Sequence, residues 1–223
     1  MFQTDPFAFI VVLIGMSLLP FLAMIATSYL KIVVVISLVR NALGIQSIPP
    51  NMVVNALAMI LSFYIMAPCI GKSWDIFKEG VGENKPDLSA RTELMAQAAE
   101  PFRDFLAEHT DTKQVAFFTT TAERLWATHE EDGSLKLAEV DARSYFVLVP
   151  AFCVSELTKA FQIGFLVYLP FIAIDIIISN ILLAMGMMMV SPVTISLPFK
   201  LLLFVMVNGW TLLIQGLVRG YII

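Results

Sequence analysis

The sequence predicts an all-α, membrane-associated protein made of hydrophobic helical hairpins with a polar helical segment inserted between them. Of its 223 residues, 58% are hydrophobic and 14% are charged, whereas soluble domains average about 45–50% and about 25%. Residues 72–143 hold 15 acidic and 9 basic side chains, and the rest of the chain holds 3 acidic and 5 basic. We therefore predict a hydrophobic hairpin over 1–71, an acidic helical segment over 72–143 and a second hydrophobic hairpin over 144–223.

The first hairpin is predicted from two apolar stretches. Residues 7–30 carry no charge and are long enough to cross a bilayer as one helix, with Pro20 inside it. Lys31 follows, either as a snorkelling side chain near a membrane face or as a polar contact inside an assembly. Residues 51–70 form the second predicted helix, which is expected to end near Pro68 and Gly71.

The link between these helices has its own signals. Arg40 opens it, and Gly44 is expected to end the preceding helix because glycine adopts a left-handed conformation readily. Pro49 and Pro50 then impose an extended connection before the helix that begins at Asn51. The link carries a cation and no acid.

The acidic segment is predicted to contain two helices. Apolar residues recur at spacings of three and four, as on one face of a helix, with Thr112 as a possible cap. The recurring residues are Val115, Phe118, Ala122 and Leu125. A second pattern over 94–105 predicts another helix, broken or bent at Pro101. Residues 130–133 are typical of an exposed turn.

The second hydrophobic hairpin contains three charged residues before its loop. Glu156 and Lys159 are three apart and share a helix face, which fits either a local ion pair or a contact between subunits. Ala160 and Gly164 are four apart and would let helices approach closely. Asp175 stands within the apolar run 172–178, so it should face protein or water, as a proton relay or as a buried polar contact. We favour the contact, because no second buried titratable group lies at adjacent helical spacing.

Residues 185–192 hold four methionines, which are Met185, Met187, Met188 and Met189. Gly186 and Pro192 interrupt this stretch, and methionine is unbranched and polarizable, so the sequence predicts a flexible apolar element between two helices. This element either packs or closes something. Lys200 lies in the second short link, and residues 201–218 are predicted to form the last helix, with Asn208 in its middle.

The two links also predict an orientation. Arg40 and Lys200 each lie in a short link without an acid, which predicts that both links are cytoplasmic. Both termini and the acidic segment would then lie on the other side, which in a bacterium is the periplasmic side of the inner membrane. The first charge is Asp5, so the N-terminus lacks the basic region of a cleavable signal.

Several classes of function lack support in the residues. Cys69 and Cys153 are expected to be free buried thiols, since a disulfide would require an oxidising compartment. His109 and His129 are isolated, which argues against a metal site. No nucleophile–base pair, phosphate-binding loop or clustered basic face indicates an enzyme, a cofactor or nucleic acid. A small-solute or ion transporter stays open as the alternative, although no inverted repeat of broken helices is evident.

Ten runs of residues, taken together, resemble one family. In the first half they are TSYLKI (27–32), RNALGIQ (40–46), IPPN (48–51) and MAP (66–68). In the second half they are PAF (150–152), SEL (155–157), AFQIGF (160–165), YLPF (168–171), ILLAMGMMM (181–189) and TISLPFKL (194–201). The sequence resembles the FliP/SctR family, core export-gate subunits of flagellar and virulence type III secretion systems, except in its acidic middle. Asn41 is the residue type that resembles the injectisome branch of the family at this position. Asn208 differs from many relatives, which carry Asp before Gly-Trp.

The resemblance implies a pentamer that assembles into a helical ring with three kinds of partner. These are a small two-helix subunit (FliQ/SctS-like), a larger subunit (FliR/SctT-like) and a further export-apparatus switch protein. Unfolded effector proteins would pass through the centre, and the methionine stretch of each copy would point into the pore and help to seal it. The resemblance also implies that the hairpins contact inner-membrane lipid without simply spanning it, because the assembled gate stands largely above the membrane plane.

Overall fold

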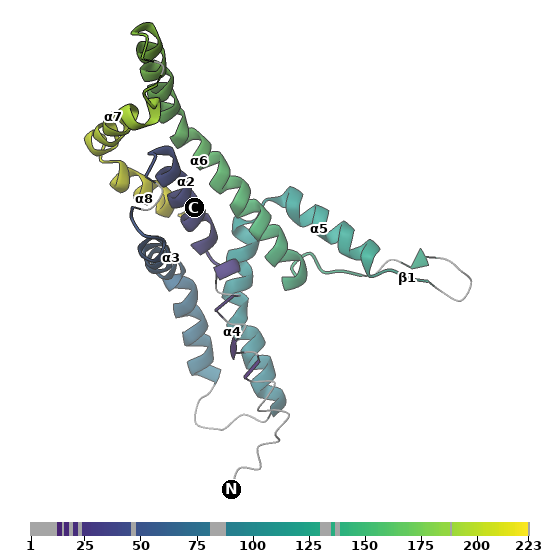
Figure 1. Cartoon of the computed structure of the whole chain (residues 1–223). Helices are drawn as coiled ribbons and strands as arrows, with labels where there is room; N and C mark the ends of the chain where they lie inside the picture. Colours follow the sequence, from purple (N-terminus) through teal and green to yellow (C-terminus); the bar gives the residue numbers. More distant parts are fainter. Residues whose placement is uncertain are drawn as a thin grey trace. The chain divides into compact units, whose positions relative to one another are not determined.

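The computed structural model describes residues 13–14, 16–17, 20–21, 24–45, 48–80, 88–129, 135–136, 139–187 and 189–222. Seven α-helices and one pair of two-residue strands make up this described part (Figure 1). Their bounds are α2 Tyr29–Ala42, α3 Asn51–Gly80, α4 Leu88–His109, α5 Thr112–Leu125, β1 Thr128–His129, β2 Leu135–Lys136, α6 Tyr145–Ala184, α7 Pro192–Met206 and α8 Gly209–Arg219. The predicted all-α class is confirmed.

The chain forms two compact units, and two of its helices pass from one into the other. The first unit comprises Met1–Leu30 and Met66–Glu156, and the second comprises Lys31–Ile65 and Leu157–Ile223. Of the predicted region boundaries, the one at 71/72 falls inside α3 and the one at 143/144 falls just before α6. The three regions themselves stay a prediction.

The core of the first unit lies between α4 and the start of α6. Leu106, Leu148 and Phe152 are fully buried there, and Val115 of α5 packs against them. The chain reaches α5 through Asp111, whose backbone N–H donates to the Ser155 hydroxyl over 3.0 Å. This contact fixes the start of α5 against α6.

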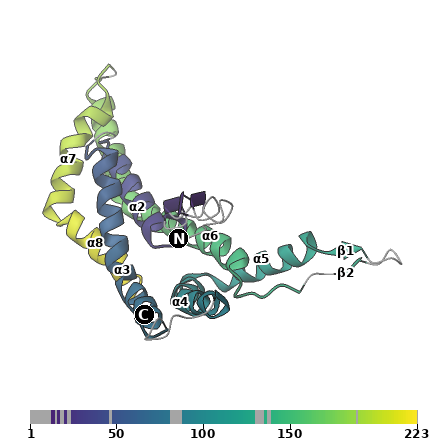
Figure 2. The same cartoon turned by 90° about the horizontal axis from the view of Figure 1, so that it is seen from below.

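Helix α5 follows the predicted periodicity, with two corrections. Its cap is Asp111, whose carboxylate accepts the Lys113 N–H over 2.9 Å, so the prediction that Thr112 caps the helix was wrong. Ala122 is buried, but Leu125, the last residue of the helix, is 74% exposed. The antiparallel pair β1–β2 lies beyond this end of α5 (Figure 2). The turn predicted at 130–133 lies outside the described residues.

Helix α4 is continuous through Pro101, so it is not broken there, and the alternative of a bend at Pro101 stays a prediction. A proline removes one helical hydrogen bond, but tertiary contacts hold the helix on both sides of it. Before Pro101, the Ala99 carbonyl accepts the Tyr145 hydroxyl over 2.7 Å. After it, the Asp104 carboxylate accepts the Arg143 guanidinium over 2.5 Å. These contacts join α4 to the chain that enters α6.

The second unit is organised around α2. Ile32, Val35 and Ile36 of this helix have no exposed surface. A Cβ on Gly164 of α6 would clash with the Leu38 side chain, so the two helices approach closely at that glycine. This is the close approach that the Ala160 and Gly164 spacing predicts.

Lys31 lies inside the second unit, near the start of α2. Only 3% of it is exposed, and its ammonium lies 3.5 Å from the centroid of the Tyr221 ring. The snorkelling interpretation was therefore wrong. A desolvated cation over an aromatic face is stabilised by the ring quadrupole, by about 2 kcal/mol.

Two predicted helices have different bounds in the structure. The described residues up to Ile25 are helical, the backbone leaves the helix at residues 26–28, and α2 begins at Tyr29, so the stretch 7–30 is not one helix. Helix α3 continues through Pro68 and Gly71 to Gly80. By length and composition, α3 and α6 could each cross a membrane, as could α7 with α8 if that bent pair counts as one span, among the residues that the structure describes.

The last predicted helix, over 201–218, is two helices bent by 59°. The break lies at Asn208, which adopts a left-handed conformation with φ of 51° and ψ of 46°. Asparagine tolerates this conformation better than most residues. At the bend the Phe204 ring packs edge-on against Trp210, with centroids 5.4 Å apart, and a Cβ on Gly209 would clash with that ring.

Candidate functional site: the methionine loop and its polar anchor

The methionine loop, residues 185–191, joins α6 to α7. Gly186 has φ of 74°. Its N–H donates to the Leu183 carbonyl over 3.0 Å, and the Met187 N–H donates to the Leu182 carbonyl over 2.9 Å. This pair of bonds is a Schellman motif, which closes the C-terminus of α6. Pro192 occupies the first turn of α7, where its missing N–H costs nothing. The predicted interruptions at Gly186 and Pro192 are confirmed.

The methionine side chains of this loop face outward. Met185 is 67% exposed, Met187 is 41% exposed and Met189 is fully exposed. Met188 lies outside the described residues. Residues 185–191 carry no charge. The described part of the loop therefore presents an exposed apolar surface that can deform.

A polar cluster joins the two helices that carry the loop. The Lys200 ammonium lies 2.7 Å from the Asp175 carboxylate, and the Ser196 hydroxyl donates to the other oxygen of that carboxylate over 2.5 Å. Lys200 also donates to the Ala42 carbonyl at the C-terminus of α2, over 3.2 Å. We name Asp175, Ser196 and Lys200 the polar anchor.

The polar anchor corrects two predictions. Lys200 is 4% exposed inside α7, so placing it in a link was wrong. Asp175 does contact a neighbouring helix, but the argument considered only titratable groups at adjacent helical spacing, so it missed Lys200, which lies 25 residues away on α7. Ser196 was missed as well. Ser196 and Lys200 are four apart and share one face of α7, which is the signal that could have found them.

The first link follows Ala42, the residue whose carbonyl accepts from Lys200. Gly44 has φ of 79° and ends α2, as predicted. The Arg40 guanidinium belongs to the last turn of α2 and donates to the Pro49 carbonyl over 2.8 Å. Pro50 precedes α3, and its carbonyl accepts the N–H groups of Val53 and Val54 in the first turn of that helix. Because Arg40 and Lys200 are both buried, neither marks a membrane surface, and the orientation stays a prediction.

Of the remaining predicted residues, Glu156, Lys159 and Cys153 lie on α6, and Cys69 lies on α3. Glu156 is fully buried and Lys159 is partly buried. Their role as a local pair or a subunit contact stays a prediction. Cys69 and Cys153 are free, and Cys153 is only partly buried. Among the described residues, no group of three or more His, Cys, Asp and Glu side chains could hold a metal ion.

Comparison with known proteins agrees with the sequence motifs. The model of the FliP family matches residues 12–217. The chain is 48% identical to Yop proteins translocation protein R of Yersinia pestis over 217 residues, which cover 97% of each chain. It is 45% identical to hypersensitivity response secretion protein HrcR of Ralstonia nicotianae over 221 residues, covering 98% of this chain and 99% of the relative.

A third relative widens the range of organisms. The chain is 41% identical to surface presentation of antigens protein SpaP of Salmonella typhi over 207 residues, covering 92% of each. These matches include the methionine loop and both helices of the polar anchor within one continuous family region. The predicted resemblance is confirmed, and the chain belongs to the FliP family.

Proposed function

We propose that this protein is a type III secretion translocation protein with a non-enzymatic transport role. The family match over residues 12–217 supports it, as do relatives at 48% and 45% identity whose names assign them to protein translocation and secretion. The apolar helices α3 and α6 support a membrane setting. We assign it to the bacterial inner membrane as a multi-pass protein.

We further propose that the chain is the core subunit of an export gate. Several copies, in all a pentamer, form a pore for unfolded effector proteins, and the methionine loops seal that pore. The observation that carries this proposal is the outward exposure of Met185, Met187 and Met189 at the tip of a helical hairpin. One loop closes nothing, so the sealing function requires a ring of copies.

Methionine suits such a seal for physical reasons. A narrow apolar constriction excludes water and ions by dewetting. The side chain has three rotatable bonds and no branch, so it yields to a passing chain and repacks afterwards. Rigid aromatic rings would leave gaps around a polypeptide of changing shape.

The polar anchor has a matching role in this proposal. It joins α6 to α7 at the base of the hairpin that carries the loop, and it joins α7 to α2 through the Ala42 carbonyl. An ionic contact that is mostly shielded from water resists separation. The loop can then deform while the base of the hairpin keeps its geometry.

The proposed partners cover the large apolar surface that one chain leaves open. On α3, Met52 is 84% exposed and Tyr64 is 71% exposed. On α6, Phe165 is 62% exposed and Leu166 is 66% exposed. We propose that further copies, a small two-helix subunit, a larger subunit, an export-apparatus switch protein and inner-membrane lipid cover these surfaces.

The test replaces the loop methionines and measures leakage. Substituting Met187, Met188 and Met189 together with alanine should let small solutes cross the membrane while the purified complex keeps its size. Met206→Ala is the matched control, because Met206 is also exposed (73%) but lies outside the loop. Unchanged permeability in assembled complexes would overturn the sealing role.

A small-solute or ion transporter remains the second candidate. The observation that favours it is the Asp175–Lys200 pair, because titratable groups within apolar helices serve as coupling sites in transporters. The same purification separates the two functions. A protein that stays monomeric with its neighbours co-expressed, and that leaks no more after methionine replacement, would favour the transporter.

A further inference from the structure

Arg40 is a buried cation that the proposed gate does not use. It is 8% exposed, and its guanidinium makes one hydrogen bond within the described part of the chain, to the Pro49 carbonyl over 2.8 Å. Its Nε is buried and has no hydrogen-bond partner. No carboxylate among the described residues forms an ion pair with it. Arginine stays charged in proteins and offers five N–H donors, so most of its donors are left for another partner.

The fold compensates the charge of Arg40 only in part. Arg40 lies in the last turn of α2, and the C-terminus of a helix carries about half a unit of negative charge. Lys200 shares that negative end through the Ala42 carbonyl, and the Asp175 carboxylate pairs with Lys200 over 2.7 Å. Burying a cation without an anion is costly, so the site favours a negative ligand. Burial therefore removes Arg40 as a marker of membrane orientation but not as a binding group.

The start of α3 provides a second attraction for an anion beside Arg40. Asn51 follows Pro49 by two residues, so the helix begins within about 8 Å of the residue whose carbonyl Arg40 contacts. Of the first four N–H groups of α3, the last two donate to Pro50. The N–H groups of Asn51 and Met52 form no hydrogen bond within the described part of the chain. Such free N–H groups, at the positive end of a helix dipole, are suited to binding a phosphate.

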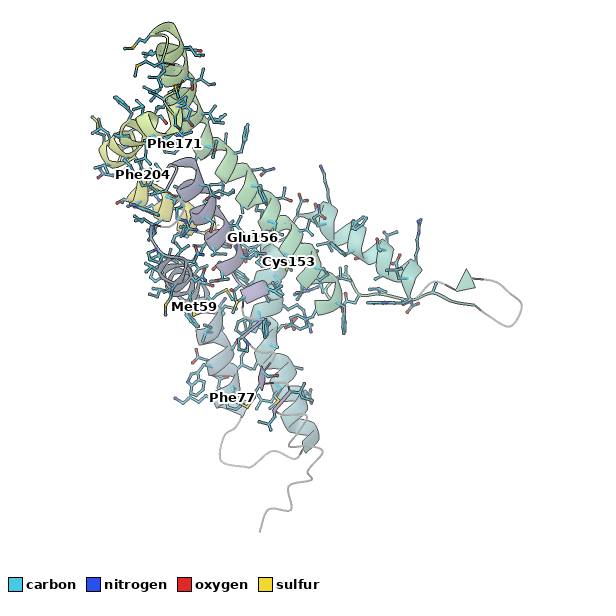
Figure 3. All side chains as sticks on the ribbon, viewed as in Figure 1. Met59, Phe77, Cys153, Glu156, Phe171 and Phe204 are labelled. Carbon is cyan, nitrogen blue, oxygen red and sulfur yellow. The ribbon has the colours of Figure 1, made fainter. Side chains whose placement is uncertain are left out.

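An exposed hydrophobic stripe begins at this site and follows α3. Within residues 52–64 every exposed side chain except Asn55 is hydrophobic, and we name this set the α3 stripe: Met52, Val53, Ala56, Met59, Ile60, Phe63 and Tyr64. Met59, labelled on α3 in Figure 3, is 43% exposed, and Met52 is 84% exposed. From Met52 to Phe63 the helix rises about 16 Å, at about 1.5 Å per residue. That length is close to half of a hydrocarbon core of about 30 Å, so the α3 stripe matches the depth of one lipid leaflet.

We propose that Arg40 and the start of α3 bind the phosphate of an anionic phospholipid whose acyl chains lie along the α3 stripe. The ligand must combine a negative group with an apolar body, because hydrophobic side chains begin directly at the start of the helix. A phosphate offers two oxygens to the planar guanidinium, which forms strong paired hydrogen bonds with such groups. The inference rests on the proposed membrane setting and deepens it by naming a lipid site.

The experiment measures lipid binding to the purified complex by native mass spectrometry. The full chain is co-expressed with its neighbours and stripped of lipid in detergent, and phosphatidylglycerol or phosphatidylcholine with the same acyl chains is then added. We expect phosphatidylglycerol to bind about tenfold more tightly and Arg40→Gln to abolish that preference, because a hydrogen bond to a charged group contributes at least such a factor. Lys72→Gln removes an exposed cation elsewhere on α3 and, as the matched control, should keep the preference.

A second variant supplies an anion from within the chain, and it decides the question if Arg40→Gln fails to assemble. Met52→Glu puts a carboxylate in the first turn of α3, where it can pair with Arg40, and should abolish the preference for phosphatidylglycerol. Met52→Gln, equally polar but uncharged, is its matched control and should keep the preference. Met52 is 84% exposed, so the fold tolerates both changes.

Three results would overturn the lipid site. They are equal binding of the two lipids by the unmodified complex, inorganic phosphate bound as tightly as phosphatidylglycerol, and a Met52→Glu variant that keeps the preference. The first is also the result expected if a carboxylate of a partner subunit occupies Arg40. None of them changes the leakage expected after methionine replacement, so failure of the lipid site and failure of the proposed seal are distinguishable.

Discussion

The Asp175–Lys200 pair allows a quantitative test, because its two members differ in burial. Lys200 has a side chain that is 5% exposed, whereas the Asp175 side chain is 32% exposed. Removing the carboxylate charge therefore leaves a buried cation, while removing the ammonium leaves a carboxylate that water still reaches. We expect Asp175→Asn to be more destabilising than Lys200→Met.

The magnitude follows from charge and separation. At 2.7 Å the gross attraction is about 6 kcal/mol for an effective dielectric constant of about 20. Desolvation offsets much of it, and breaking a buried pair from one side costs about 3–5 kcal/mol. We expect about 3 kcal/mol for Asp175→Asn, since the Ala42 carbonyl still accepts from Lys200. For Lys200→Met we expect about 1–2 kcal/mol, because solvent screens Asp175 and Ser196 still donates to it.

The double variant gives the sharpest expectation. Asp175→Asn with Lys200→Met removes both charges and should lie within about 1 kcal/mol of the unmodified protein. The free energy of unfolding is measured on purified protein in detergent, by thermal unfolding followed through helix content. For a chain of this length, 1 kcal/mol corresponds to about 2–4 °C in Tm. Ser179→Ala, a partly buried polar change on α6 outside the anchor, serves as the matched control.

Two results would refute this reasoning. If the cost of the double variant equals the sum of the two single costs, the pair has no coupling and the contact contributes nothing. If Lys200→Met is the more destabilising change, the burial difference does not control the energetics. Either result would remove the polar anchor as a stabilising base for the loop.

Two further predictions use the same unfolding measurement. Gly164→Ala should lower the free energy of unfolding by about 1–3 kcal/mol, because its Cβ would clash with Leu38. Gly216→Ala, at a helical glycine with open space around it, should raise it by about 0.5–1 kcal/mol. Equal effects of the two substitutions would contradict the close approach of α2 and α6. Asn208→Gly should leave the free energy of unfolding nearly unchanged, whereas Asn208→Val should lower it by about 1–2 kcal/mol, because a β-branched residue disfavours φ of 51°. An Asn208→Val variant as stable as the unmodified protein would contradict the left-handed break between α7 and α8.

Local signals in the sequence predicted helix ends well where glycine or paired prolines stand in links. Gly44 ends α2, Asn51 begins α3, and Gly186 ends the last turn after α6, as expected. Gly44 and Gly186 both have a positive φ, which glycine adopts readily and most other residues do not. The same reasoning failed at Pro68, where α3 continues, and α4 is not broken at Pro101, because a helix can lose one hydrogen bond and still continue.

The site was predicted in part for a related reason. The apolar, uncharged character of residues 185–191 depends on consecutive residues and is visible in the sequence. The pairing of Asp175 with Lys200 depends on how α6 and α7 fold back on each other across 25 residues. Ser196 gave no signal alone, since a serine in an apolar helix most often bonds its own backbone.

One buried cation, Lys200, fixes the hairpin to the C-terminus of α2. Lys200 donates to the Ala42 carbonyl, and Arg40 lies in the last turn of the same helix. The C-terminus of a helix carries partial negative charge on carbonyls that lack intrahelical partners, so cations there are stabilising. The charges that suggested a membrane orientation therefore have a structural use inside the chain. The Asp175–Lys200 contact holds the base of the hairpin, while the methionines at its tip are uncharged and exposed, which is what the proposed seal requires.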